Sequence, residues 1–426
     1  MKKVYIETYG CALNKGDTYI MKTVLARKGY SIVDNPIASD IIIINTCTVR
    51  METQQRMIHR IKTLYKFAIE RDKKLIIAGC LAKAQPYLVS KIAPNASLLS
   101  PQNVSKIDVV VRESKKVILL DGDRDRNTIG VWLEDRIGIV PIQEGCLGNC
   151  SFCIVKNARR KLFSYPMEHI AETVRELIKK GAVEIQLSGQ DTATYGIDLY
   201  GKPMLPKLIQ RIIETPGNYM IRIGMLNPDT IEPILDDLIK AMRDHHVYKF
   251  LHIPLQSGSD KVLKIMRRKY TVDQFRHIIK ELRSKLPDIA IATDIIIGHP
   301  GEDEEDFEDT LRIVKELEFD RIHVAQYTIR PNTYSASLKQ VSSKIKKERM
   351  KRFLELMENI GLKKHSKYLG KVVKAFVTEK GKNSYTARLI NYTPVVINSD
   401  KEIIGKWINA RIHKITFFDL RGDVIG

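Results

Sequence analysis

The sequence predicts an α/β protein in three parts: a doubly wound parallel sheet, a partial (β/α)6 barrel and a small antiparallel β-barrel. Short apolar segments alternate with amphipathic segments of helical period over most of the 426 residues. Such alternation is typical of parallel sheets covered by helices. Near the C-terminus the pattern changes to a period of two, which is typical of antiparallel strands. We expect the parts to span residues 1–112, 132–362 and 363–426.

The first part contains three expected strands, each followed by a cysteine. The expected strands are residues 4–6, 40–45 and 75–78, with helices at 17–28 and 53–71. Ligands of open parallel sheets bind at the carboxyl ends of strands. We therefore expect Cys11, Cys47 and Cys80 along one edge of one sheet. The alternative is that all three are small buried hydrophobic residues.

A charged stretch, residues 113–136, follows the first part. It begins like a calcium loop at Asp121, but Arg126 stands at the position that requires glycine, and no glutamate follows at the ligating distance. We expect a solvated connection.

The second part has the pattern of a parallel barrel. The expected strands after the first are residues 183–187, 220–224, 250–254, 289–297 and 321–327, and the helices are 169–180, 231–244, 272–286 and 304–317. About six such units predict a full or partial barrel whose chemistry lies at the carboxyl ends of the strands.

The third part is basic and short. A long basic helix is expected over residues 344–368, and strands over 372–378, 385–390, 395–398 and 407–418. From Lys363 onward there are 13 lysines and arginines against 5 acids, a net charge of +8. Nucleic acid is the simplest partner for such a surface. Some of its aromatic residues could stack on bases, while others must fill the core of the barrel.

Composition excludes several classes of protein. The chain is 44% hydrophobic, its net charge is +20, and its longest aliphatic run is residues 41–44. No membrane partner is expected from so short a run, and the N-terminus has no signal-peptide pattern. Six cysteines in so long a chain are too few for a disulfide scaffold. We expect a cytoplasmic monomer whose cysteines bind metal or react. The charge favours a polyanionic partner, although a basic surface of thermophilic type would look similar.

The strongest motif is the CxxxCxxC pattern of Cys146, Cys150 and Cys153, which follows an expected strand at residues 139–143. Three thiolates on one loop can hold three irons of a [4Fe–4S] cluster and leave the fourth open. An open iron could chelate S-adenosylmethionine (SAM), and one electron would then release a 5′-deoxyadenosyl radical. The alternatives are a zinc site, which normally needs a fourth protein ligand, and three unrelated thiols.

With this motif, the chain resembles the radical-SAM methylthiotransferases almost from end to end. Segments 9–14 (YGCALN), 45–50 (NTCTVR) and 78–80 (AGC) are similar to the three N-terminal cysteine motifs of that family. The resemblance implies a second [4Fe–4S] cluster on Cys11, Cys47 and Cys80. It also implies a radical-SAM core barrel and a C-terminal TRAM domain, an RNA-binding β-barrel. The N-terminal domain would then dock over the carboxyl ends of the barrel strands.

Other segments resemble the archaeal and eukaryotic branch, which acts on N6-threonylcarbamoyladenosine of tRNA. They are residues 187–192 (LSGQDT), 221–228 (IRIGMLNP), 252–259 (HIPLQSGS), 292–298 (ATDIIIG) and 391–396 (NYTPVV). The branch that acts on a ribosomal protein usually has proline and lysine where this chain has Ala12 and Leu13.

Residue roles follow from this resemblance. Phe152 is similar to the aromatic residue beside the SAM adenine, and Ser188 and Gln190 occupy the segment that contacts the methionine amino group. Arg222 and Gln256 are candidates for the ribose or carboxylate of SAM, and Asp294 lies in the segment near the adenosine. A charged residue inside a barrel can also be a structural pair, which remains an even alternative for Arg222 and Asp294.

The chain also departs from the family pattern. Arg160 stands where glycine usually follows Ala-Arg, His299 where phenylalanine is common, and Asn332 and Tyr334 where glycine and proline are usual. Outside the motifs, His245 and His246 lie in a polar segment and are expected to be solvated.

The resemblance implies a tRNA methylthiotransferase that modifies threonylcarbamoyladenosine at position 37, in the anticodon region. It would use SAM, two clusters, an electron donor and a sulfur source. One alternative is methylthiolation of a ribosomal protein side chain, which the basic terminal part disfavours. A non-catalytic iron–sulfur RNA-binding protein would not need an open iron.

Overall fold

The first part of the chain folds into a six-stranded parallel sheet in the order β2-β1-β3-β4-β5-β6. A computed structural model describes residues 1–159 and 161–425. The strands of this sheet are β1 (Lys3–Thr8), β2 (Ser31–Val33), β3 (Ile41–Thr46), β4 (Lys74–Gly79), β5 (Ser97–Leu99) and β6 (Ile118–Leu119). Helices α1 (Ala12–Arg27), α2 (Met51–Glu70), α3 (Cys80–Ala84), α4 (Pro86–Ile92) and α5 (Ile107–Arg112) connect them. Strands β2, β5 and β6 are too short to stand out in the sequence.

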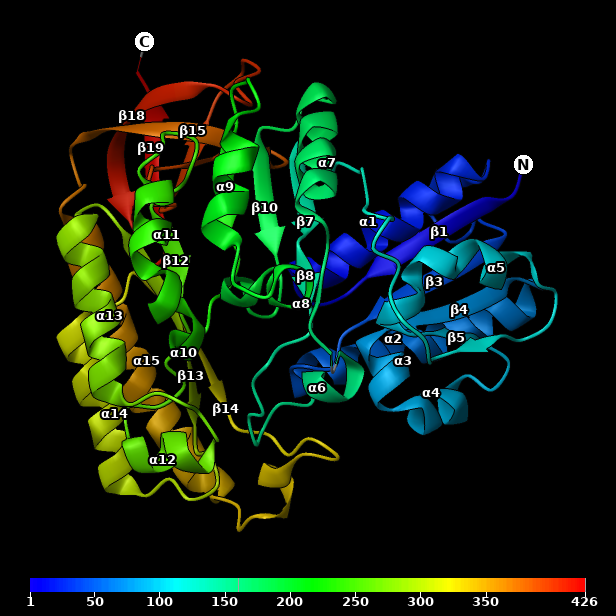
Figure 1. Cartoon of the computed structure of the whole chain (residues 1–426), viewed down its shortest axis with the longest axis horizontal. Coiled ribbons are helices and arrows are strands. Elements are labelled where there is room, and N and C mark those ends of the chain that lie inside the picture. The colour runs from blue at the N-terminus through cyan, green and yellow to red at the C-terminus, as the bar shows by residue number, and fades with distance from the viewer. Residues whose placement is uncertain (160, 426) are drawn as a thin grey trace.

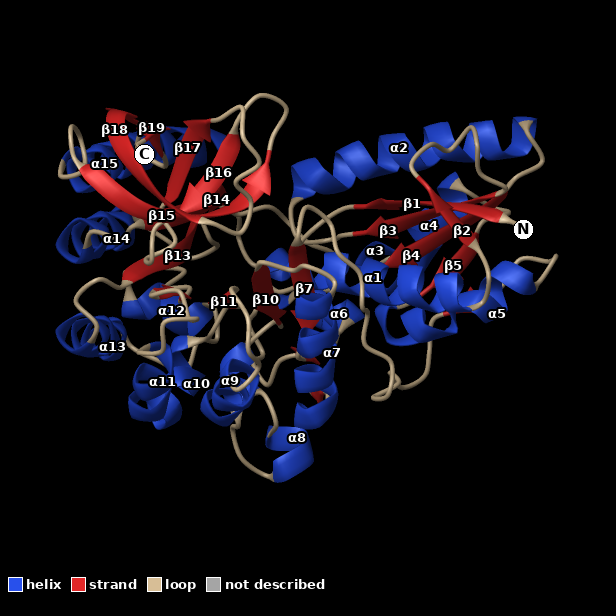
Figure 2. Ribbon diagram, turned by 90° about the horizontal axis from the view of Figure 1, so that it is seen from above, coloured by secondary structure: helices blue, strands red, loops and turns tan. Residues whose placement is uncertain are grey.

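The doubly wound prediction for this sheet is confirmed. The isoleucines of β3 alternate between two cores, with Ile42 and Ile44 on one face and Ile41 and Ile43 on the other. Helices cover both faces, as Figure 2 shows for α2 on one side and α1 and α5 on the other. The strand order reverses between β1 and β3, so the sheet has its switch point there. Ligands of such sheets bind outside the carboxyl ends of the strands at this point.

The second part is an open barrel of six parallel strands, as predicted. The strands are β7 (Ile137–Pro141), β10 (Glu184–Ser188), β11 (Met220–Ile223), β12 (Phe250–His252), β13 (Ala290–Ile297) and β14 (Arg321–Gln326). They form the runs β7-β10-β11 and β12-β13-β14, joined by isolated bridges Ile221–Val247 and Met225–His252. A short hairpin of β8 (Gln143–Glu144) and β9 (Phe163–Ser164) follows β7.

Helices surround the barrel on its outer side (Figure 1). They are α7 (Met167–Lys179), α8 (Ile197–Tyr200), α9 (Leu205–Ile213), α10 (Pro228–Ile231), α11 (Leu235–Met242), α12 (Asp260–Ile265), α13 (Val272–Lys285), α14 (Glu304–Leu317) and α15 (Ser343–Ser366). The short helix α6 (Val155–Ala158) lies instead beside α3 of the N-terminal part. Capping boxes begin α13 and α14, where Thr271 and Asp303 accept hydrogen bonds from the first helical turn. None of the described helices is long and apolar enough to cross a membrane.

The third part is a closed five-stranded barrel in the order β15-β16-β17-β19-β18. Its strands are β15 (Val372–Lys380), β16 (Tyr385–Arg388), β17 (Pro394–Asn398), β18 (Trp407–Ile415) and β19 (Leu420–Val424). Neighbouring strands are antiparallel except for β17 and β19, which run parallel. A short fifth strand, β19, closes the barrel in this way; the expected strand over residues 407–418 ends before it, so β19 was not predicted from the sequence.

The small barrel closes the amino-terminal end of the large one (Figure 1). Tyr392 is buried in a cluster with Tyr248 and Phe250, which lie at or just before the start of β12. Its hydroxyl donates to Glu184 Oε1 over 2.8 Å. Tyr392 is therefore a packing residue at this interface, so it is not free to stack on RNA.

The connection at residues 113–136 is not the solvated link that its composition predicts. Ile118 and Leu119 add β6 to the sheet, and the side chain of Arg124 is only 2% exposed. Gly130 packs so closely on α1 that a Cβ there would lie 2.5 Å from the Ile20 nitrogen. The charged composition wrongly predicted exposure to solvent, because buried acidic residues elsewhere in the chain compensate the charge of Arg124.

Candidate active site

The three closely spaced cysteines lie on the loop between β8 and α6, at the carboxyl end of the first barrel strand. The sulfurs of Cys146 and Cys150 lie 3.3 and 3.8 Å from the position that a Cβ on Gly148 would occupy. The Gly148 N–H also donates to the Cys146 sulfur over 3.2 Å. Glycine at this position thus leaves room between two thiols that lie on the same side of the loop.

Two side chains from later barrel units contact these thiols. Asn227 Nδ2 lies 3.6 Å from the Cys146 sulfur, and Arg268 Nη1 lies 3.3 Å from the Cys150 sulfur. Arg268 also donates to Asn227 Oδ1 over 3.1 Å. The position of Asn227 just after a strand could have identified it as a candidate site residue. Arg268 lies in a basic segment that is typical of an ordinary protein surface, so the sequence did not mark it.

The other three cysteines follow β1, β3 and β4, which are neighbours at the switch point of the N-terminal sheet. A Cβ on Gly10 would lie 2.7 Å from the Cys47 Cβ, so the turn that carries Cys11 packs against Cys47. Burial raises the pKa of the Cys47 thiol, and it raises the pKa of Cys80 to about 12. Thiolates are the metal-binding form of cysteine, so metal binding at these buried thiols would release protons.

The N-terminal domain docks over the mouth of the barrel, as expected. Arg330, which follows β14, donates to the backbone oxygen of Thr48 and to Gln54 Oε1. From the cluster loop, Arg159 Nε reaches the Cys80 sulfur over 3.4 Å. Two arginines of the barrel domain therefore reach the N-terminal site, one beside Cys47 and one beside Cys80.

A cavity of about 580 Å³ lies where the domains meet. The cluster loop contributes Phe152 and Cys153, and the barrel contributes Gln256, Asp294 and His323. The N-terminal domain contributes residues 49–52, the segment that begins two residues after Cys47. The cluster loop and the segment that follows Cys47 thus border one space.

The candidate SAM residues do not all lie at this cavity. Phe152, Gln256 and Asp294 line it. Gln190 accepts a hydrogen bond from the Gly145 N–H over 2.7 Å, beside the cluster loop. Ser188 Oγ is buried at the end of β10 with no partner among the described residues. Arg222 lies deeper in the barrel, 5.3 Å from the ring of Tyr392.

Gln256 is the most constrained of these residues. Its φ is 71°, in the left-handed region that favours glycine. Strands hold it there, because its N–H donates to the Asp294 oxygen over 2.8 Å and its own oxygen accepts from Ile296 over 3.0 Å. In the described structure its buried Oε1 has no donor. Strained residues with unpaired polar atoms are typical of ligand sites.

Comparison with known proteins agrees with this geometry. Residues 3–100 match the Uncharacterized protein family UPF0004, residues 140–314 the Radical SAM superfamily and residues 366–425 the TRAM domain. A probable threonylcarbamoyladenosine tRNA methylthiotransferase of Methanocaldococcus jannaschii is 38% identical, over 99% of this chain and 97% of that protein. The human threonylcarbamoyladenosine tRNA methylthiotransferase is 34% identical, over 97% of this chain and 72% of that protein.

The chain belongs to the threonylcarbamoyladenosine tRNA methylthiotransferase family of radical SAM proteins.

Solved structures show the same fold at low identity. The radical SAM methyltransferase TsrM from Kitasatospora setae, with tryptophan and a SAM analogue bound, superposes with a TM-score of 0.61. It is 12% identical, and the match covers 79% of this chain and 75% of that one. This likeness supports the sheet and barrel architecture alone.

Membership in the radical SAM superfamily implies SAM and one [4Fe–4S] cluster for this methylthiotransferase family member. The donor set fits, because the cluster loop offers three thiols, which is the number that leaves one iron open. The unpaired Gln256 oxygen beside the cavity gives a polar ligand a partner.

At the cavity, the predicted residue Asp294 lies in a polar group with two histidines that were not predicted, His323 in the cavity wall and His252 behind it. The ligand atoms of the three side chains lie within 4.8 Å of one another. His252 Nε2 lies 3.0 Å from Asp294 Oδ1. Burial lowers the pKa of His323 to about 4, and the charges of Arg321 and Arg50 act in the same direction. These positive charges disfavour a bound cation. Within the group, His252 and Asp294 form a hydrogen-bonded pair, and the ring of His323 lies 5.3 Å from that of His252.

His299, which stands where the family commonly has phenylalanine, predicts an acid-sensitive fold. Burial lowers its pKa to about 4, while an unfolded histidine titrates near 6.5. The unfolded state therefore binds more protons between these values, and stability falls as pH drops through this window. Between pH 7.5 and 5.5 the loss attributable to His299 should be about 1 kcal/mol.

Urea unfolding of the natural chain and His299→Phe at the two pH values measures this loss. The variant should lose less stability on acidification, because phenylalanine has no group to protonate in this window. Ser335, the partner of His299 Nε2, keeps its bond to Ser151 over 2.8 Å in the variant. An equal pH dependence of the two chains contradicts the prediction.

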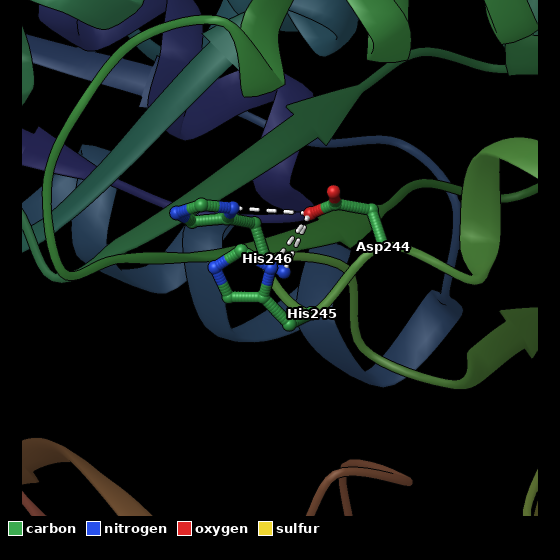
Figure 3. A group of neighbouring side chains, drawn as sticks. All are labelled: Asp244, His245 and His246. Carbon is green, nitrogen blue, oxygen red and sulfur yellow. Dashed lines mark hydrogen bonds and ion pairs between the residues drawn. The ribbon is translucent and has the colours of Figure 1, made fainter.

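The expectation that His245 and His246 are both solvated is half wrong. The His245 side chain is 83% exposed, but that of His246 is only 12% exposed. His246 Nδ1 lies 3.0 Å from Asp244 Oδ1 (Figure 3). Its Nε2 lies 3.2 Å from the Gly217 oxygen. These contacts pin the loop before β12 to the loop before β11.

Proposed function

We propose that this protein converts N6-threonylcarbamoyladenosine at position 37 of tRNA to its 2-methylthio derivative. The single observation that carries the proposal is the shared cavity, bordered by Phe152 and Cys153 on one side and by residues 49–52 on the other. A reaction that joins a radical step to sulfur transfer needs both sites at one substrate. The names of the relatives supply the nucleoside.

The roles of the chain's own residues follow. Cys146, Cys150 and Cys153 would hold the SAM-binding cluster, and Cys11, Cys47 and Cys80 a second [4Fe–4S] cluster. The first three thiols would hold a cluster whose chemistry, once it is reduced and SAM is bound, would supply a radical able to attack the unreactive C2–H bond of adenine. Phe152, Gln256 and Asp294 would orient SAM in the cavity, with Ser188 and Gln190 beside the loop and Arg222 as the most distant candidate.

The proposal extends to the partners of the protein and to its cellular compartment. The C-terminal barrel, from residue 363, would bind the tRNA near its anticodon. The domain limits 1–112, 132–362 and 363–426 remain our proposal, as does a monomer that receives electrons and sulfur from other molecules. We place the protein in the cytoplasm, since free thiols persist in reducing compartments.

Mass spectrometry of tRNA nucleosides from cells with and without this protein tests the proposal. We expect the 2-methylthio derivative to disappear and unmodified threonylcarbamoyladenosine to accumulate when the protein is absent. An unchanged nucleoside profile contradicts the proposal and favours a protein substrate. Restoration by the natural chain, and not by a chain lacking Cys150, is the control.

A further inference from the structure

Arg159 lies between the two sets of cysteines. It directly follows α6, the short helix after Cys153, and its side chain is 1% exposed. From this position it crosses into the N-terminal domain, where its Nε donates toward the Cys80 sulfur over 3.4 Å. Among the described arginines and lysines, only Arg159 donates to an N-terminal cysteine sulfur.

Both terminal nitrogens of Arg159 are also engaged. Nη1 donates to Glu144, and Nη2 donates to Asp17 and, over 3.2 Å, to Asn14 Oδ1. This network fixes the direction of the Nε–H bond. Because Glu144 precedes Cys146 and Arg159 follows Cys153, their ion pair also closes the base of the cluster loop.

Arg124 completes a buried set of four charges with Asp17, Glu144 and Arg159. It donates to Asp17 Oδ1 over 2.5 Å and to Glu144 Oε2 over 2.8 Å. All four side chains are at most 3% exposed. Two positive and two negative charges balance, which buried ions require. Arg124 makes no hydrogen bond to a cysteine of the described chain, so it is a matched control for Arg159.

A hydrogen bond to a cluster sulfur changes the reduction potential. A reduced [4Fe–4S] cluster carries one more negative charge than the oxidised form, so an N–H···S bond from a cationic donor stabilises the reduced form more. The midpoint potential rises as a result. Buried surroundings strengthen the effect, because the local dielectric constant is low.

We propose that Arg159 is a positioning residue for the N-terminal cluster: its Nε–H bond to Cys80 raises the reduction potential of that cluster. The same guanidinium holds the base of the radical-SAM cluster loop, so one side chain of the barrel domain sets the properties of a site in the other domain. This inference rests on the proposed second cluster at Cys11, Cys47 and Cys80.

The test uses the full chain with Cys146, Cys150 and Cys153 replaced by alanine, so that only the N-terminal cluster remains. Arg159→Lys in this background keeps the charge and removes the Nε–H donor. Potentiometric titration with dithionite, followed by electron paramagnetic resonance, should show a lower midpoint potential. We expect at least a tenfold loss in the reduction equilibrium, about 59 mV for one electron. Arg124→Lys should leave the potential unchanged.

The outcomes separate this inference from the proposed function. An unchanged potential in Arg159→Lys, with about four irons per chain, overturns the inference and leaves the second cluster intact. An equal shift in Arg124→Lys also overturns it, because the effect would then come from the buried charge set as a whole. Absence of iron from the triple-alanine background overturns the second cluster and the inference together.

A measurement on the natural sequence covers the case in which Arg159→Lys does not fold. The chain is labelled with 15N-arginine, loaded with both clusters and reduced. Pulsed electron paramagnetic resonance should detect a coupled arginine nitrogen at the cluster whose signal does not respond to SAM. Lack of any arginine nitrogen coupling at that cluster overturns the inference.

Discussion

Cys150→Ala should abolish reductive cleavage of SAM. The cluster loop offers three thiols, and each must hold one iron to leave the fourth iron open for SAM. Loss of the middle thiol removes a ligand and the acceptor of the Arg268 hydrogen bond, which spans 3.3 Å. We expect 5′-deoxyadenosine formation, measured by chromatography with dithionite as reductant, to fall to the level of the iron-free chain.

Leu147→Ala is the matched control on the same loop. Leu147 is 51% exposed, and its side chain offers no metal ligand, so its truncation leaves the three thiols in place. The control should keep its iron and its SAM cleavage, while Cys150→Ala should fall from about eight to about four irons per chain. Cleavage at the natural rate by Cys150→Ala means that the loop does not hold the SAM-binding cluster.

Cys47→Ala should separate SAM cleavage from methylthio transfer. Cys47 lies at the switch point of the N-terminal sheet. Its domain touches the cavity through residues 49–52, whereas the cluster loop belongs to the barrel domain. The SAM-binding site should therefore survive its loss. We expect continued 5′-deoxyadenosine formation and loss of the methylthiolated nucleoside, both measured in one reaction on tRNA lacking the modification.

Cys47→Ala and Cys150→Ala are controls for each other. Each should retain about four irons, yet only Cys47→Ala should cleave SAM. Met57→Leu tests packing, because the Met57 sulfur accepts the Cys47 N–H over 3.2 Å; this variant should keep both activities. Methylthio transfer by Cys47→Ala contradicts the assignment of Cys47 to a sulfur-carrying cluster.

The cysteines of the candidate site could be found from sequence because their signals are local. Cys146, Cys150 and Cys153 lie within eight consecutive residues, and each N-terminal cysteine follows an apolar strand. The arginines that contact these thiols could hardly be predicted from the sequence. Arg268 is 118 positions from Cys150, and Arg159 is 79 positions from Cys80. No periodicity links residues so far apart, so their contacts depend on how the domains pack.

Two further expectations show the same limit. The charges of residues 113–136 indicated solvent, but Arg124 is buried because Asp17, 107 positions earlier, meets it across the interface. Tyr392 is one of the aromatic residues of the third part, some of which were expected to stack on RNA. Packing instead places it against Phe250 and Glu184 at the closed end of the barrel.

The sequence by itself determined the order of the parts, the parallel and antiparallel periods, and the division of six cysteines into two sets of three. These properties follow from local spacing, since the side-chain period selects strand or helix. Only the tertiary structure decided that the cluster loop and residues 49–52 border one cavity, that Arg159 lies between the two sets of cysteines, and that the C-terminal barrel closes the far end of the large one. Burial of apolar surface brings the domains together, and the buried charges between them require partners that only this packing supplies.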